Sequence, residues 1–100
     1  MPPRLRTAIT LPGASSSVAD VLALARRAES VGYDDLWLAD AGGMDGLTLA
    51  ALLAQNTSRV RIGIAVVPAY TRTPAVLAST VATIAQLAPQ RFVLGLGTSS

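Results

Sequence analysis

Short apolar runs alternate with longer helical patterns along the whole chain, and this alternation constrains the fold more than any other feature. The apolar runs begin near residues 5, 34, 60 and 91. Roughly 25 to 30 residues therefore separate successive starts, which is the length of one strand and helix unit in a parallel sheet. The sequence predicts an α/β chain of the form (βα)3β with parallel strands.

Capping residues and prolines set the expected boundaries. Ser17 and Asp45 are suited to cap the first two helices, Thr73 precedes a proline at the first position of the third, and Gly32 ends the first. The helices are expected over residues 18–31, 46–56 and 74–87, and the strands over 5–11, 33–40, 60–67 and 91–97. The apolar run of the second strand indicates a sheet covered on both faces.

Two folds are compatible with this pattern: a doubly wound open sheet and half of a (βα)8 barrel. Periodicity alone reveals neither the order of the strands nor closure. A complete barrel needs about 250 residues. If this chain of 100 residues belongs to a barrel, it is therefore a fragment of one.

Three missing residue types narrow the chemistry. The chain contains no cysteine, histidine or lysine, which excludes zinc sites of cysteine and histidine, thiol nucleophiles, Ser-His-Asp triads and a P-loop lysine within these residues. We expect no metal site. Few side chains remain that could act as an acid, a base or a nucleophile, so the sequence favours a redox cofactor that brings its own reactivity.

Charge distribution argues against nucleic acid and membrane partners. The eight arginines are scattered, whereas nucleic-acid binders concentrate their charge. Residues 73–90 carry no charge but include polar side chains and prolines at both ends, so we expect a buried helix rather than a membrane span. The N-terminus lacks the apolar core of a secretory signal, and a cytoplasmic location is expected.

The second and third predicted helices have no charged face. Residues 46–58 and 73–90 lack charged side chains altogether, although an exposed helix normally has one solvated face. We expect these helices to form a subunit interface. The alternative is that further segments of the same protein cover them.

Candidate functional residues follow from the rule that α/β proteins place function at the C-terminal ends of strands. Asp40 is the only carboxylate at such an end, and it is either a ligand or acid/base group, or a cap of the following loop. Tyr70 and Arg72 are candidates for holding a planar anionic ligand, or are surface residues. Trp37, flanked by leucines, is expected in the core.

The last residues offer a candidate anion cradle. Gly95 and Gly97 permit close approach of a ligand to the backbone, and three hydroxyl residues follow over 98–100. The spacing is not a dinucleotide-binding fingerprint. A tight turn after the strand explains the glycines equally well.

Three segments together resemble the N-terminal part of the luciferase-like monooxygenase superfamily, and more closely its branch that depends on the deazaflavin coenzyme F420. They are residues 32–40 (GYDDLWLAD), 61–74 (RIGIAVVPAYTRTP) and 91–97 (RFVLGLG). The resemblance covers nearly the whole chain. It implies that residues 1–100 form the N-terminal half of a TIM (βα)8 barrel, as part of a single domain.

The resemblance also implies cofactor contacts and a partner. A non-prolyl cis peptide in a bulge of the third strand, here Ala65 to Val66, would support the back of the ring. Asp40 would lie at the edge of the ring, and the loop after the fourth strand would approach the ribityl and phosphate side through the residues Gly97, Thr98 and Ser99. Helices 46–56 and 74–87 would pack in a homodimer.

Two positions depart from the family pattern. Some deazaflavin-dependent relatives have a histidine and a glutamate where this chain has Ala41 and Ser100. Their proton-transfer roles therefore cannot be transferred, and no catalytic residue is assigned. The leading hypothesis is hydride transfer between F420 and an organic substrate. The alternatives are an FMN-dependent monooxygenase of the same fold and a non-catalytic, self-associating half-barrel.

Overall fold

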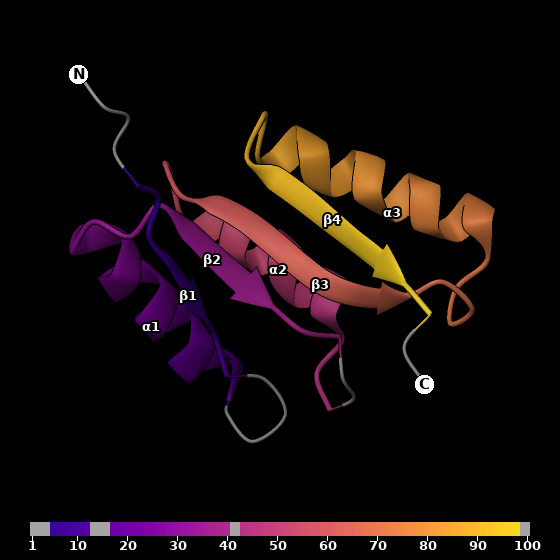
Figure 1. Cartoon of the computed structure of the whole chain (residues 1–100), viewed down its shortest axis with the longest axis horizontal. Coiled ribbons are helices and arrows are strands. Elements are labelled where there is room, and N and C mark those ends of the chain that lie inside the picture. Colours follow the sequence, from indigo (N-terminus) through magenta and orange to yellow (C-terminus); the bar gives the residue numbers. More distant parts are fainter. Residues whose placement is uncertain (1–4, 13–16, 41–42, 99–100) are drawn as a thin grey trace.

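The computed structural model describes residues 5–12, 17–40 and 43–98. In this part of the chain strands and helices alternate without exception (Figure 1). The elements are β1 (Ala8–Thr10), α1 (Val18–Ser30), β2 (Asp35–Leu38), α2 (Gly46–Asn56), β3 (Arg61–Pro68), α3 (Pro74–Leu87) and β4 (Phe92–Gly97). The predicted (βα)3β organisation is confirmed.

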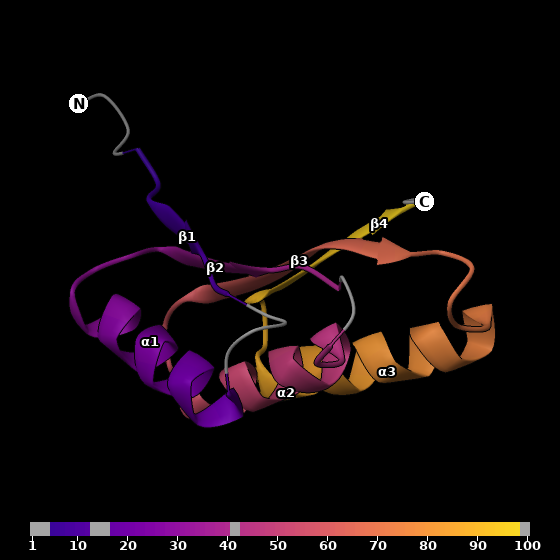
Figure 2. The ribbon, with the colours of Figure 1, turned by 90° about the horizontal axis from the view of Figure 1, so that it is seen from below.

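The winding of the sheet settles the choice between the two folds. The strands form one sheet in the order β1-β2-β3-β4, and all neighbouring pairs are parallel. Figure 2 shows α1, α2 and α3 together on one face of this sheet. A doubly wound sheet reverses its strand order and carries helices on both faces, so this is the winding of a (βα)8 barrel.

The hydrophobic core lies between the sheet and the three helices. Leu36, Ile62 and Ile64 from the middle strands meet Leu47 and Leu53 from α2, and all five side chains are fully buried. Removing such a side chain from water contributes about 1.5 to 3 kcal/mol. Burial of one face of α2 therefore fixes this helix against β2 and β3.

In the described part of the chain, helices cover one face of the sheet and not the other, whereas the sequence predicted a sheet covered on both faces. The position of Trp37 also differs from its prediction. Thr10, Trp37, Gly63 and Val93 share one row across the four strands. Trp37 is only half-buried, and its ring lies so close to Gly63 that a Cβ there would be 2.5 Å from ring carbon Cζ3. Trp37 thus packs on the uncovered face rather than in the core, because its neighbours in β2 point toward the helices.

Helix boundaries follow the predictions closely, whereas two strands are shorter than expected. The Ser17 hydroxyl accepts a hydrogen bond from the Asp20 amide at 3.1 Å, and Gly32 has a positive φ of 104° just after α1. β2 begins only at Asp35, because the amides of Tyr33 and Asp34 bond to Ala28 and Thr7 rather than along a strand.

The third helix, α3 (Pro74–Leu87), is less buried within this chain than the sequence predicted. Only Leu77 and Ile84 of α3 are buried, so the helix is largely exposed rather than buried. Val76 and Leu87 are among its exposed apolar side chains. Within the described ranges, no helix combines the length and the apolar character needed to cross a membrane.

Candidate functional site

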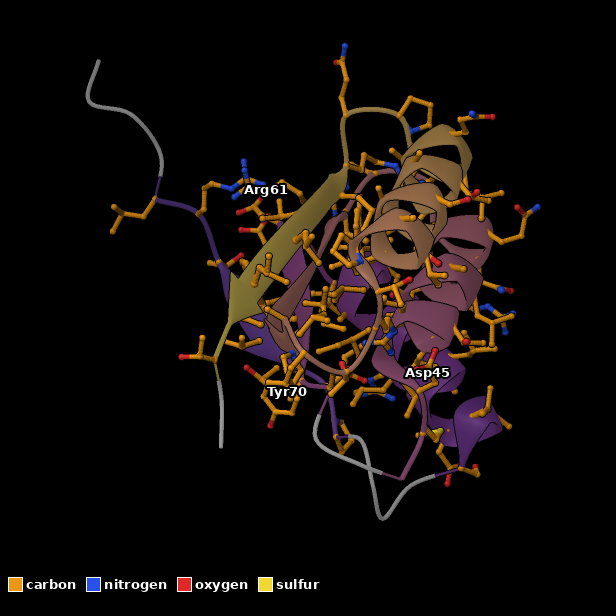
Figure 3. All side chains as sticks on the ribbon, turned by 90° about the vertical axis from the view of Figure 1, so that its right-hand side faces the viewer. Asp45, Arg61 and Tyr70 are labelled. Carbon is orange, nitrogen blue, oxygen red and sulfur yellow. The ribbon has the colours of Figure 1, made fainter. Side chains whose placement is uncertain are left out.

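The C-terminal edge of the sheet gathers most of the predicted site residues that the structure describes. Asp40 follows β2, Tyr70 and Arg72 follow β3, and Thr98 follows β4. Figure 3 shows Asp45 and Tyr70 toward this end of the strands and Arg61 toward the opposite end. Parallel strands bring these loops together although they are distant in sequence.

Arg72 joins two carboxylates at this edge. Its Nη1 donates to Oδ2 of Asp40 at 2.9 Å, and its Nη2 donates to Oδ1 of Asp45. The side chains of Arg72 and Asp40 are 17% and 12% exposed, whereas that of Asp45 is 52% exposed. We call this group the Asp40–Arg72–Asp45 cluster. With one guanidinium for two carboxylates, it has a formal charge surplus of one negative unit.

Both carboxylates of the cluster also cap the N-terminus of α2. Asp40 Oδ1 accepts from the amide of Gly46 at 2.9 Å, and Asp45 Oδ2 accepts from the amide and hydroxyl of Thr48 at 3.0 and 2.6 Å. The amides of a first helical turn have no acceptor inside the helix, and carboxylates also interact favourably with the positive end of the helix dipole. The interpretation of Asp40 as a cap is therefore confirmed by its bond to the Gly46 amide. This bond does not test the alternative, in which Asp40 is a ligand or an acid/base group.

Gly46 allows this arrangement by having no side chain. A Cβ at this position would lie 2.5 Å from Cδ1 of Ile64 and 3.0 Å from Oδ1 of Asp40. Any larger residue would therefore push the α2 N-terminus away from Asp40 and β3.

Hydrogen bonding favours the charged forms of Asp45 and Arg72. Donation from the Thr48 hydroxyl, aided by the Thr48 amide and Arg72, lowers the pKa of Asp45 despite partial desolvation. The hydrogen bond to Asp40 is the main cause of a raised pKa for Arg72. The cluster borders an open depression of about 430 Å³, lined also by Gly43, Met44 and Thr71.

A bulge interrupts β3 beside this edge. The pairing of β3 with β4 shifts between Ile64 and Val67, and the peptide bond from Ala65 to Val66 is cis. The cis bond and bulge expected from the family resemblance are thus confirmed. Both Ala65 and Val66 are exposed, Val66 by 40%, so the bulge presents apolar surface.

The glycines of β4 fit closely against this bulge. A Cβ on Gly97 would lie 2.5 Å from Cγ1 of Val66, and one on Gly95 would lie 2.8 Å from the carbonyl oxygen of Ile64. Close packing of β3 on β4 therefore accounts for both glycines without a ligand. Thr98 directly follows the strand, whereas Ser99, Ser100 and Ala41 lie outside the described residues. The anion cradle stays a prediction.

Two other predictions change in the structure. The sequence makes Arg72 a candidate for holding an anionic ligand, but two carboxylates of the protein itself already engage its guanidinium. Asp45 was predicted only as a helix cap, and its pairing with Arg72 was missed because the two residues are 27 positions apart. Tyr70 is 69% exposed, in agreement with its surface interpretation.

Comparison with known proteins identifies the family. The model of the luciferase-like monooxygenase family matches residues 2–100. The chain belongs to this family. A putative coenzyme F420-dependent oxidoreductase of Mycobacterium tuberculosis is 38% identical over 76 residues, which cover 76% of this chain and 22% of that protein.

Solved structures agree with the barrel-type fold. The coenzyme F420-dependent tetrahydromethanopterin reductase of Methanopyrus kandleri superposes with a TM-score of 0.86 at 24% identity, covering 98% of this chain and 28% of its own. The oxygenating component of 3,6-diketocamphane monooxygenase of Pseudomonas putida, in complex with FMN, superposes with a TM-score of 0.81 at 19% identity, covering 97% and 30%. The chain spans about a quarter of the length of the curated relatives it matches.

Proposed function

We propose that this chain forms the cofactor-facing N-terminal part of an oxidoreductase that transfers hydride between coenzyme F420 and an organic substrate. The observation that carries the proposal is the C-terminal edge of the sheet, where the exposed apolar bulge of β3 and the Asp40–Arg72–Asp45 cluster occur in a chain whose relatives include proteins named as F420-dependent. The substrate is left open.

The residues present fit a planar, amphipathic ring. Ala65 and Val66 would support one face of the ring with apolar contacts, while Asp40 would offer a carboxylate to its polar edge. Gly97, Thr98 and Ser99 would border the ribityl and phosphate side. When bound, the deazaflavin supplies the hydride chemistry. The protein's own part is to position and orient the cofactor, since this chain has an alanine and a serine where some relatives have proton-transferring side chains.

An FMN-dependent monooxygenase is the second candidate. It is favoured by the likeness in fold to the FMN-bound monooxygenase of Pseudomonas putida. The apolar bulge would serve a flavin as well as a deazaflavin, because both rings are flat and extended. Cofactor preference is therefore the decisive measurement.

Titration of the natural polypeptide that carries this sequence with F420 and with FMN, followed by fluorescence, tests the proposal. We expect F420 to bind and FMN to compete weakly. Val66→Glu, at the bulge, should weaken F420 binding at least tenfold. Val31→Glu is a matched control, since Val31 is also exposed but lies after α1, at the other end of the sheet. Binding of FMN alone would favour the monooxygenase, and binding of neither would favour a non-catalytic module.

We also propose that α2 and α3 form a homodimer interface. Support comes from the absence of charge over 46–58 and 73–90 and from a groove of about 340 Å³ between the two helices. The groove is lined by Leu47, Thr48, Ala51, Ser79, Thr80, Thr83 and Ile84. Ala51→Arg should convert the dimer to a monomer in sedimentation equilibrium, whereas Ala23→Arg on α1 should not. A dimer that survives Ala51→Arg would contradict this proposal.

A further inference from the structure

We propose that Arg72 is a positioning residue that holds the Asp40 carboxylate in the orientation used at the cofactor edge. This inference rests on the proposed function for the role of Asp40, but its geometry stands on the structure alone. Arg72 is not expected to touch the cofactor, because its Nη1 and Nη2 groups are directed at Asp40 and Asp45.

The two carboxylate oxygens of Asp40 accept hydrogen bonds from two different parts of the chain. Oδ1 accepts from the Gly46 amide at the start of α2, and Oδ2 accepts from Arg72 in the loop before α3, each at 2.9 Å. With both oxygens engaged, rotation of the carboxylate about its last bond is restricted. The carboxylate thereby has a fixed direction at the C-terminal edge of the sheet.

The two carboxylates of the cluster depend on Arg72 to different degrees. Asp45 keeps two hydrogen bonds from Thr48 when Arg72 is removed, and its side chain is 52% exposed, so water can replace the guanidinium. Asp40 is 12% exposed and, among the bonds of the described residues, would keep only the one from Gly46. Loss of Arg72 should therefore disturb Asp40 more than the helix cap formed by Asp45.

Amide hydrogen exchange tests this asymmetry without any cofactor. In Arg72→Gln, the Gly46 amide should exchange at least tenfold faster, because its acceptor Asp40 is free to rotate. The Thr48 amide, held by Asp45, should stay within about twofold. The control Arg61→Gln removes another ion pair, the one between Arg61 at the start of β3 and Asp35 at the start of β2, and should leave both amides unchanged. Equal acceleration of both amides would mean that the N-terminus of α2 frays as a whole. Unchanged exchange of the Gly46 amide would mean that Arg72 is not needed to hold the Asp40 carboxylate. Either result would overturn the proposal.

Cofactor affinity provides a second, independent readout through a double-mutant cycle. If Arg72 acts through Asp40, Arg72→Gln should weaken F420 binding in the wild-type background but have little effect in the Asp40→Asn background. In the Asp45→Asn background it should weaken binding as it does in the wild type. Additive effects of Arg72→Gln and Asp40→Asn would overturn the proposal.

If the wild-type protein binds neither F420 nor FMN, the proposed function fails, while the exchange of Gly46 and Thr48 still decides whether Arg72 positions Asp40. Should Arg72→Gln not fold, Arg72→Lys replaces it. Lysine keeps the charge but cannot span both carboxylates with one planar fork, so the Gly46 amide should again exchange faster than in the wild type.

Discussion

The two ends of the sheet carry ion clusters of opposite composition. At the N-terminal end, Arg6 and Arg61 share the single carboxylate of Asp35, with shortest distances of 2.6 and 3.1 Å. At the C-terminal end, Asp40 and Asp45 share the single guanidinium of Arg72. One trio has a surplus of positive charge and the other of negative charge. The second trio lines an open depression, and it lies toward the same end of the sheet as the exposed apolar bulge of β3.

Charged groups at the N-terminal end also serve the backbone. Glu29 accepts from the amides of residues 58–60, just before β3. Arg91 donates to the carbonyl groups of Ala54, Thr57 and Val60 and to the hydroxyl of Thr57. Both side chains complete backbone hydrogen bonds that the α2 to β3 connection cannot make by itself. In barrels the N-terminal end of the strands serves stability and the C-terminal end serves function, and we expect the two ends to respond differently to mutation.

The largest effect on stability is expected for Arg91→Met. The substitution removes four donated hydrogen bonds and leaves part-buried carbonyl groups without partners, so the free energy of unfolding should fall by about 3 kcal/mol. Urea denaturation measures this loss. The control Arg26→Met removes one exposed bond to Asn56 and should cost less than about 0.5 kcal/mol. Equal effects of both variants would remove the assigned role of Arg91.

Glu29→Gln should have an intermediate, pH-dependent effect. Burial opposes ionisation, but hydrogen bonds from the Val60, Arg59 and Ser58 amides outweigh it, so the pKa of Glu29 lies below its ordinary value. A lowered folded pKa gives stability that is present above the unfolded pKa, about 4.3, and is lost as the pH falls through the folded pKa.

At pH 7 the Glu29→Gln variant should therefore lose about 1.5 kcal/mol of unfolding free energy. The difference from the wild type should shrink steadily as the pH is lowered below about 4. Denaturant titrations at several pH values measure both. A difference that is independent of pH would mean that the charge of Glu29 contributes nothing.

Of the substitutions Arg91→Met, Glu29→Gln and Asp45→Asn, the last, at the C-terminal end, is expected to have the smallest effect on stability. Asparagine is also a good N-cap, so the Thr48 amide keeps an acceptor and the loss of charge should cost less than about 1 kcal/mol. Thermal unfolding of the variant beside Glu29→Gln makes the comparison. A larger loss of stability for Asp45→Asn than for Glu29→Gln would contradict the expectation that the N-terminal end of the sheet serves stability and the C-terminal end serves function.

Features that depend on neighbours in sequence were readable from the sequence. The caps Ser17, Asp45 and Thr73 each accept from an amide three residues later, so a local pattern contains the whole interaction. The bounds of α2 and α3 followed from such caps. The bulge in β3 was found by resemblance to a family rather than from any physical pattern in the residues.

Features that depend on the winding of the chain were decided only by the tertiary structure. Arg72 meets Asp40 across 32 positions, because parallel strands bring successive loops to one edge of the sheet. Trp37 lies on the uncovered face, because all described helices pack on the other one. Alternation along the sequence determined that this is a (βα)3β chain. It could not determine on which side each helix returns, and that choice sets which charged groups meet at the candidate site.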